Sequence, residues 1–180
     1  MATLRLVLAL AFLALAAPLV LAQQPPQAQL VPASCHVTTR PQMAFVPPSE
    51  YRLTEPLPEG VFRIGSEKLW TEIHEPEVWT WRQRGPGSDV NLTNKIFWYR
   101  VGYSWRTEPH PRLKVTGRRL DGDAPPLEVM EPMTHAIIDM TGRGAMLAGI
   151  YMPTPGCWEI TGDYEGDRVS FVVWVVPTAH

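Results

Sequence analysis

The chain has 180 residues and is almost electroneutral, with 16 basic against 18 acidic side chains and a formal net charge of −2. Domains that bind nucleic acid or anionic lipid carry clusters of Lys and Arg, so this balance argues against both functions. The 19 prolines and 13 glycines disfavour long helices and predict many turns between short strands.

Residues 1–22 have the features of a secretory signal peptide. Arg5 supplies a positive start, residues 6–21 are apolar, and Val20-Leu21-Ala22 offers a cleavage site before Gln23. The apolar run of about 16 residues is shorter than the ~20 that span a bilayer, so an uncleaved membrane anchor is the less favoured alternative. We expect an exported protein, periplasmic or extracellular, whose mature chain has no membrane span.

Residues 23–59 form a proline- and glutamine-rich stretch, called the lead-in segment below. Such a composition favours extended or polyproline conformations rather than a packed core. We therefore expect this segment to wrap the surface of a domain that spans residues 60–180.

From residue 61 onward the apolar residues repeat with a period of two, which is typical of β-strands. The longest such run covers residues 95–105 and predicts a central strand. Its core-facing residues are predicted to be Phe97, Tyr99, Val101, Tyr103 and Trp105. Trp98 falls on the opposite face of this strand.

The C-terminal region predicts a hairpin. Residues 156–164 alternate so that Trp158, Ile160 and Tyr164 face the core while Glu159 faces water, and a turn at residues 165–167 leads into a last apolar strand. Eight or nine short strands with turns at intervals of about 8–12 residues predict an all-β fold, an immunoglobulin-like β-sandwich.

The chain contains two cysteines, Cys35 and Cys157. In an oxidising compartment a disulfide is the simplest prediction. By alternation Cys157 lies on the face opposite Trp158, so the bond would tie the lead-in segment to the strand that opens the last hairpin. Lipidation of Cys35 is the alternative, and the preceding Pro32-Ala33-Ser34 lacks the leucine that such a site favours.

Met130, Met133 and His135 suggest a copper site, because thioethers select Cu(I) and imidazole accepts either oxidation state. His110 and Met140 could add ligands if the loops converge. The hypothesis requires Met130, Met133 and His135 to lie in one exposed loop. The alternative is that both methionines fill gaps in the core.

Trp79, Trp98 and Trp174 suggest a second kind of site. If they lie on exposed sheet faces, they could stack against sugars or other planar ligands. Alternatively, the lead-in segment covers those faces and buries the rings.

The sequence offers little for catalysis. The histidines have no metal-hydrolase spacing, no Gly-x-Ser-x-Gly nucleophile turn occurs, and a disulfide would leave no free thiol. We therefore expect a protein that is not an enzyme.

Three stretches, residues 95–103, 113–121 and 153–162, resemble a set of uncharacterised bacterial exported proteins and lipoproteins. Their markers are a Val-Thr-Gly-Arg-Arg-Leu-Asp block and a C-terminal Gly-Cys-Trp-Glu-Ile-Thr-Gly block. The resemblance implies an immunoglobulin-like sandwich, and it brings neither an activity nor site residues.

These observations favour a non-catalytic binding or scaffold domain of the cell envelope, without a cofactor, that recognises an unknown partner or polymer. A periplasmic copper-binding module and a carbohydrate- or polymer-binding module are the alternatives.

Overall fold

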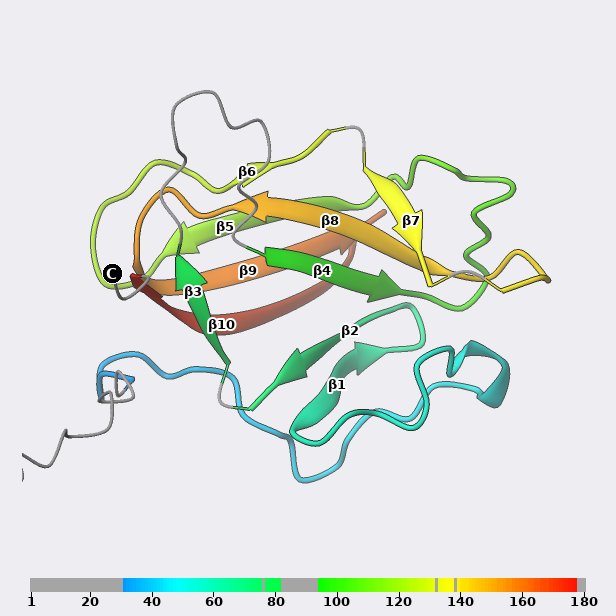
Figure 1. Cartoon of the computed structure of the whole chain (residues 1–180), viewed down its shortest axis with the longest axis horizontal. Helices are drawn as coiled ribbons and strands as arrows, with labels where there is room; N and C mark the ends of the chain where they lie inside the picture. The colour runs from blue at the N-terminus through cyan, green and yellow to red at the C-terminus, as the bar shows by residue number, and fades with distance from the viewer. Residues whose placement is uncertain (1–30, 76, 82–93, 132, 138, 178–180) are drawn as a thin grey trace, which may run out of the picture.

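The computed structural model describes residues 31–75, 77–81, 94–131, 133–137 and 139–177, so the predicted signal peptide lies outside the described residues. Within these ranges the chain forms ten strands and one short 3-10 turn, η1 (Ser49–Tyr51) (Figure 1). The strands are β1 (Val61–Ser66), β2 (Leu69–His74), β3 (Val78–Trp81), β4 (Asn94–Tyr99), β5 (Lys114–Arg119), β6 (Glu128–Val129), β7 (Thr134–Ala136), β8 (Ala145–Tyr151), β9 (Gly156–Tyr164) and β10 (Asp167–Pro177).

The strands form two sheets that pack face to face (Figure 1). The six-stranded sheet has the order β1-β2-β4-β8-β6, with β7 also paired to β8, and the four-stranded sheet has the order β3-β10-β9-β5. The order β2-β4-β8-β6 opposite β5-β9-β10 is that of the four- and three-stranded sheets of an immunoglobulin domain. The predicted all-β sandwich is therefore confirmed.

The C-terminal hairpin has the predicted form. β9 and β10 pair antiparallel from Asp167↔Tyr164 to Val175↔Gly156, and both turn residues, Glu165 and Gly166, have positive φ. On the core side Trp158, Ile160 and Tyr164 are buried, as the alternation indicates.

The central strand differs from the prediction. β4 ends at Tyr99, and the inward-facing residues are Ile96 and Trp98, both in the main core. Phe97 and Tyr99 belong instead to a second apolar cluster with Trp70. Because both faces of this strand are covered, alternation of apolar residues could not tell which face is the core.

The described part of the lead-in segment, residues 31–59, runs along the side of the sandwich where β1 and β10 lie (Figure 1) and contacts both sheets. Near its start, a disulfide joins Cys35 to Cys157 with a Cα–Cα distance of 5.6 Å, as predicted. Thr38 then bonds β10, because its N–H donates to the Val172 carbonyl at 2.9 Å and its hydroxyl accepts from the Val172 N–H at 2.8 Å. Further on, Phe45 and Tyr51 pack on the second apolar cluster.

Among the described residues, no helix has the length and apolar character needed to cross a membrane.

Candidate binding cleft

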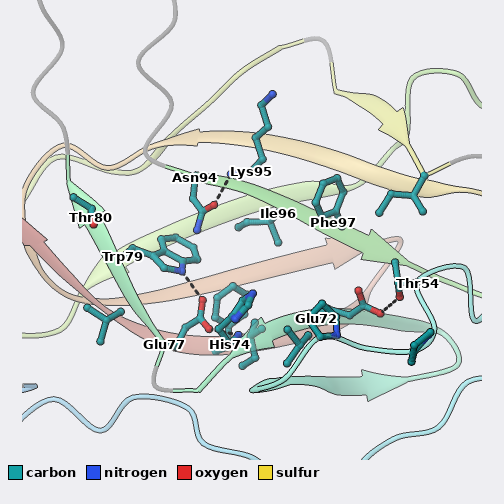
Figure 2. A pocket seen from close by; sticks show the side chains of 17 residues that line it. Thr54, Glu72, His74, Glu77, Trp79, Thr80, Asn94, Lys95, Ile96 and Phe97 are labelled. Atoms are coloured by element: carbon teal, nitrogen blue, oxygen red, sulfur yellow. Dashed lines mark hydrogen bonds between the residues drawn. The ribbon is translucent and has the colours of Figure 1, made fainter.

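A cleft of about 750 Å³ opens on one flank of the sandwich (Figure 2). Its walls are β2, β3 and β4, and residues of the lead-in segment line one end. Figure 2 shows the side chains of β3 and β4 converging over the strands of the four-stranded sheet behind them. This cleft is the candidate functional site.

The cleft exists because the chain changes sheets between β2 and β3. β2 pairs with β4 at only two positions, Trp70↔Tyr99 and Thr71↔Trp98. Beyond them the chain leaves the six-stranded sheet, and β3 pairs in parallel with β10 of the other sheet. The first half of β4 thus has no neighbour on this side among the described strands, and the cleft opens there.

The floor of the cleft is apolar and belongs to the core. Ile73, Trp79, Ile96 and Phe171 line it and are all buried. The rings of Trp79 and Phe171 meet edge to face with centroids 6.0 Å apart, a favoured aromatic geometry. The floor is therefore an apolar surface continuous with the core.

Glu77 places a carboxyl group in this wall. It is only 4% exposed, and its carboxylate accepts hydrogen bonds from the Trp79 indole N–H and, at 2.5 Å, from the His74 backbone N–H. Burial raises the pKa of Glu77 to about 7, against the opposing effect of these two hydrogen bonds. A titrating group in a cleft is a recognised mark of a functional site.

The opposite end of the cleft is held by a polar network around Glu72. One of its oxygens accepts hydrogen bonds from the Thr54 hydroxyl at 2.5 Å and from Arg63 Nε at 3.0 Å. The buried Arg63 also bonds Glu55 at 3.0 Å, and the Tyr99 hydroxyl donates to Glu72 at 3.3 Å. This network ties the lead-in segment to the sheet and neutralises the Glu72 charge.

The rim is polar and accessible. Lys95 is exposed, and its backbone N–H donates to the side-chain oxygen of Asn94 at 2.8 Å. His74 and Thr80 are exposed on the other walls. An apolar floor with a few polar groups at the rim is the usual composition of a ligand-binding site.

A second hollow, of about 520 Å³, lies over β5, β9 and β10 on the outer face of the four-stranded sheet. Its charges pair with each other, Arg118 with Glu159 and Arg168 with Asp163, both at 2.6 Å. Exposed pairs of this kind contribute little energy and are common on protein surfaces. We regard this hollow as the weaker candidate.

The three tryptophans of the predicted ligand platform do not come together. Trp98 is fully buried in the core, where it packs on Phe171 and against Gly162. Trp174 is half-buried on the outer face of β10. Only Trp79 lines the cleft, as part of its buried floor. The condition of the ligand-platform hypothesis, exposed rings, is therefore not met at Trp98 and Trp79, because both lie on core-facing positions of their strands.

The expectation that the copper ligands share an exposed loop is also contradicted. Met133 is buried in the core at 3% exposure, while Met130 is half-buried and pairs its backbone N–H with the Gly149 carbonyl. The His135 ring stacks on Trp105 at 5.2 Å. Among the described residues, no group of three or more His, Cys, Asp or Glu side chains is placed to hold a metal ion.

Sequence patterns do not identify the polar residues of the cleft, including Glu77, Asn94 and Lys95. They come from separate strands, and their spacing follows no motif. The one available signal was Pro76, which interrupts the strand pattern just before Glu77 and marks the region where the chain changes sheets.

No model of a known protein family matches the sequence, and no curated protein matches it either. Among solved structures, a Bacillus anthracis protein named as a candidate lipoprotein is similar with a TM-score of 0.35 and 17% identity, over 67% of this chain and 81% of that one. At this level nothing can be transferred, and the resemblance to bacterial exported proteins stays a prediction.

Proposed function

We propose that this protein is a non-catalytic binding domain of the cell envelope and that its ligand occupies the cleft between β2, β3 and β4. The observation that carries the proposal is the open flank itself. It combines a volume of about 750 Å³, which is within the usual range for ligand sites, with a buried apolar floor and a buried carboxyl group.

The polar groups of the cleft support binding rather than chemical turnover. Glu72 is held by Arg63 and Thr54, and Glu77 is held by Trp79 and the His74 backbone. Both carboxyl groups thus have fixed positions within the wall. Fixed polar groups above an apolar floor are suited to orienting a ligand.

The proposed location rests on the disulfide and on the predicted signal peptide. The bond between Cys35 and Cys157 is typical of proteins that work in oxidising compartments such as the periplasm or the cell exterior.

Site-specific photo-crosslinking in the native host tests the proposal. p-Benzoylphenylalanine is introduced at Lys95, on the exposed rim of the cleft, and separately at Arg118, on the outer face of the four-stranded sheet. We expect adducts from position 95 and not from position 118. Adducts from position 118 alone would move the site to the outer face, and the absence of adducts from both positions would contradict the proposal.

A further inference from the structure

At Asn94 and Lys95, β4 has an edge without a partner among the described strands, called the free edge below. The backbone of this edge faces the cleft. The Phe97 carbonyl accepts a hydrogen bond from the Thr71 hydroxyl at 2.8 Å, so the backbone groups of Phe97 point toward β2. Because direction alternates along a strand, the backbone groups of Lys95 point the same way. The pairing of β2 with β4 stops at Thr71↔Trp98, and among the described strands Asn94 and Lys95 therefore have no partner on this side.

The opposite wall of the cleft is also a strand edge. β3 is the outermost strand of the four-stranded sheet and pairs only with β10 among the described strands. Two strand edges from different sheets therefore border one cleft, as Figure 2 shows for the residues around Trp79 and Ile96. Free edges are templates for an added strand.

The Lys95 N–H gives a local sign of an incomplete ladder. It donates to the Asn94 side chain at 2.8 Å, although a strand N–H normally pairs with a neighbouring strand. The side-chain oxygen of Asn94 thus occupies the place that a strand carbonyl would take. Such a bond is exchanged easily for a backbone bond, because one acceptor replaces another.

The charges in the cleft are complementary to a cation. Glu72 is paired with Arg63, whereas Glu77 forms no ion pair with the described residues and is bonded only by neutral N–H groups. A carboxylate with two oxygens can accept further hydrogen bonds. A basic side chain above the apolar floor would therefore complement Glu77.

From these observations we infer that the cleft binds an extended peptide segment, which adds as a strand to the free edge of β4 at Asn94 and Lys95, beyond the last pair with β2. Alternate apolar side chains of the peptide would lie on the floor formed by Trp79, Ile96 and Phe171, and a basic side chain would meet Glu77. This inference rests on the proposed function and names the class of ligand.

The test uses peptides selected from a random phage-displayed dodecapeptide library against the full oxidised protein. The selected sequence is synthesised unmodified and in two backbone N-methylated forms, each methylated at one of the two alternate sets of residues. In an added strand only one set donates to β4. We expect that set to lower the affinity at least roughly tenfold when methylated, while the other set changes it by less than about threefold.

Two further measurements locate the bound peptide. Amide hydrogen exchange at Lys95 should slow on binding, whereas amides of β5, on the far side of the four-stranded sheet, should not change. Glu77→Gln should weaken a peptide with a basic residue by roughly tenfold, and should leave a variant of that peptide with norleucine at the basic position unaffected. Circular dichroism of Glu77→Gln verifies that it is folded.

Several outcomes would overturn the inference. These are failure to select any cleft-dependent peptide, equal losses from both methylated forms, or protection at β5 rather than at β4. If crosslinking from position 95 instead captures a small molecule, the peptide inference falls while the cleft remains the binding site. If crosslinking from position 95 captures nothing, the proposed function fails with it.

Discussion

The C-terminal hairpin and the flank around β2 and β4 differ sharply in how their strands pair. β9 and β10 are matched residue by residue at nine positions, while β2 and β4 are matched at two. In the hairpin every alternate side chain enters the core, whereas on the flank the chain leaves one sheet for the other. The difference predicts that the hairpin contributes more to stability than the flank does.

Trp158→Ala should produce the largest effect, because this side chain is fully buried and its indole N–H donates to the Thr154 carbonyl at 3.0 Å. Removing a buried tryptophan costs about 3–5 kcal/mol through lost burial and the cavity that remains. A urea titration followed by circular dichroism measures the free energy of unfolding. A loss below about 1 kcal/mol would mean that the hairpin is not the stable half.

Replacing both Cys35 and Cys157 by serine should cause the second-largest loss of stability. The bond joins residues separated by 122 positions, and loss of a native disulfide typically costs about 2–5 kcal/mol. The expected result is a lower urea midpoint and faster trypsin cleavage after Arg40 in the lead-in segment. An unchanged cleavage rate would show that Thr38 and its bonds to β10 hold the segment without the disulfide.

The Glu77 carboxyl should make stability fall as pH rises. Its pKa is about 7 in the folded protein against an ordinary 4.5. Between pH 4.5 and 7 the folded state therefore keeps a proton on Glu77 that the unfolded state has released. Stability should therefore decrease from about pH 4.5 to 7 and level off above that, by at most roughly 3 kcal/mol.

In Glu77→Gln this part of the pH dependence should disappear, as measured by urea midpoints at a series of pH values. Glu159→Gln, at an exposed ion pair, serves as the control and should keep the slope. Identical slopes in wild type and Glu77→Gln would assign the effect to another group.

The smallest effect is expected for Glu159→Ala. Its side chain faces solvent one residue from Trp158 and pairs with an Arg118 that is 72% exposed. Exposed pairs contribute at most about 1 kcal/mol, and we expect a change of no more than about 0.5 kcal/mol. If Glu159→Ala destabilised the protein more than Trp158→Ala, the assignment of faces in β9 would be reversed.

The sequence predicts the hairpin well and β4 poorly, for a physical reason. In β9 one face is apolar and the other polar, so alternation identifies the core side. In β4 the lead-in segment covers the outer face, and Phe97 and Tyr99 look as apolar as Ile96 and Trp98. Alternation carries no information where both faces are buried.

The disulfide was predictable from two cysteines and their placement, whereas the cleft was not. The residues of the cleft come together because β3 pairs with β10 in the sheet opposite β2. β3 and β10 are far apart in the sequence. Hydrophobic periodicity and short motifs relate residues that are close in sequence, so they cannot reveal where two strands fail to pair. Glu77 gave no signal beyond its position after Pro76.

The attachment of Thr38 to β10 has a kinetic consequence. The two partners, Thr38 and Val172, are 134 residues apart. β3 likewise pairs with β10, a strand far from it in the sequence. Contacts between distant parts of a chain slow folding because a large loop must close first. When the reduced chain refolds, the lead-in segment and β3 should therefore be the last parts to acquire protection from hydrogen exchange, after the hairpin that both of them dock on. In the oxidised chain the disulfide already holds Cys35 at β9, so the delay should remain for β3 and disappear for Thr38.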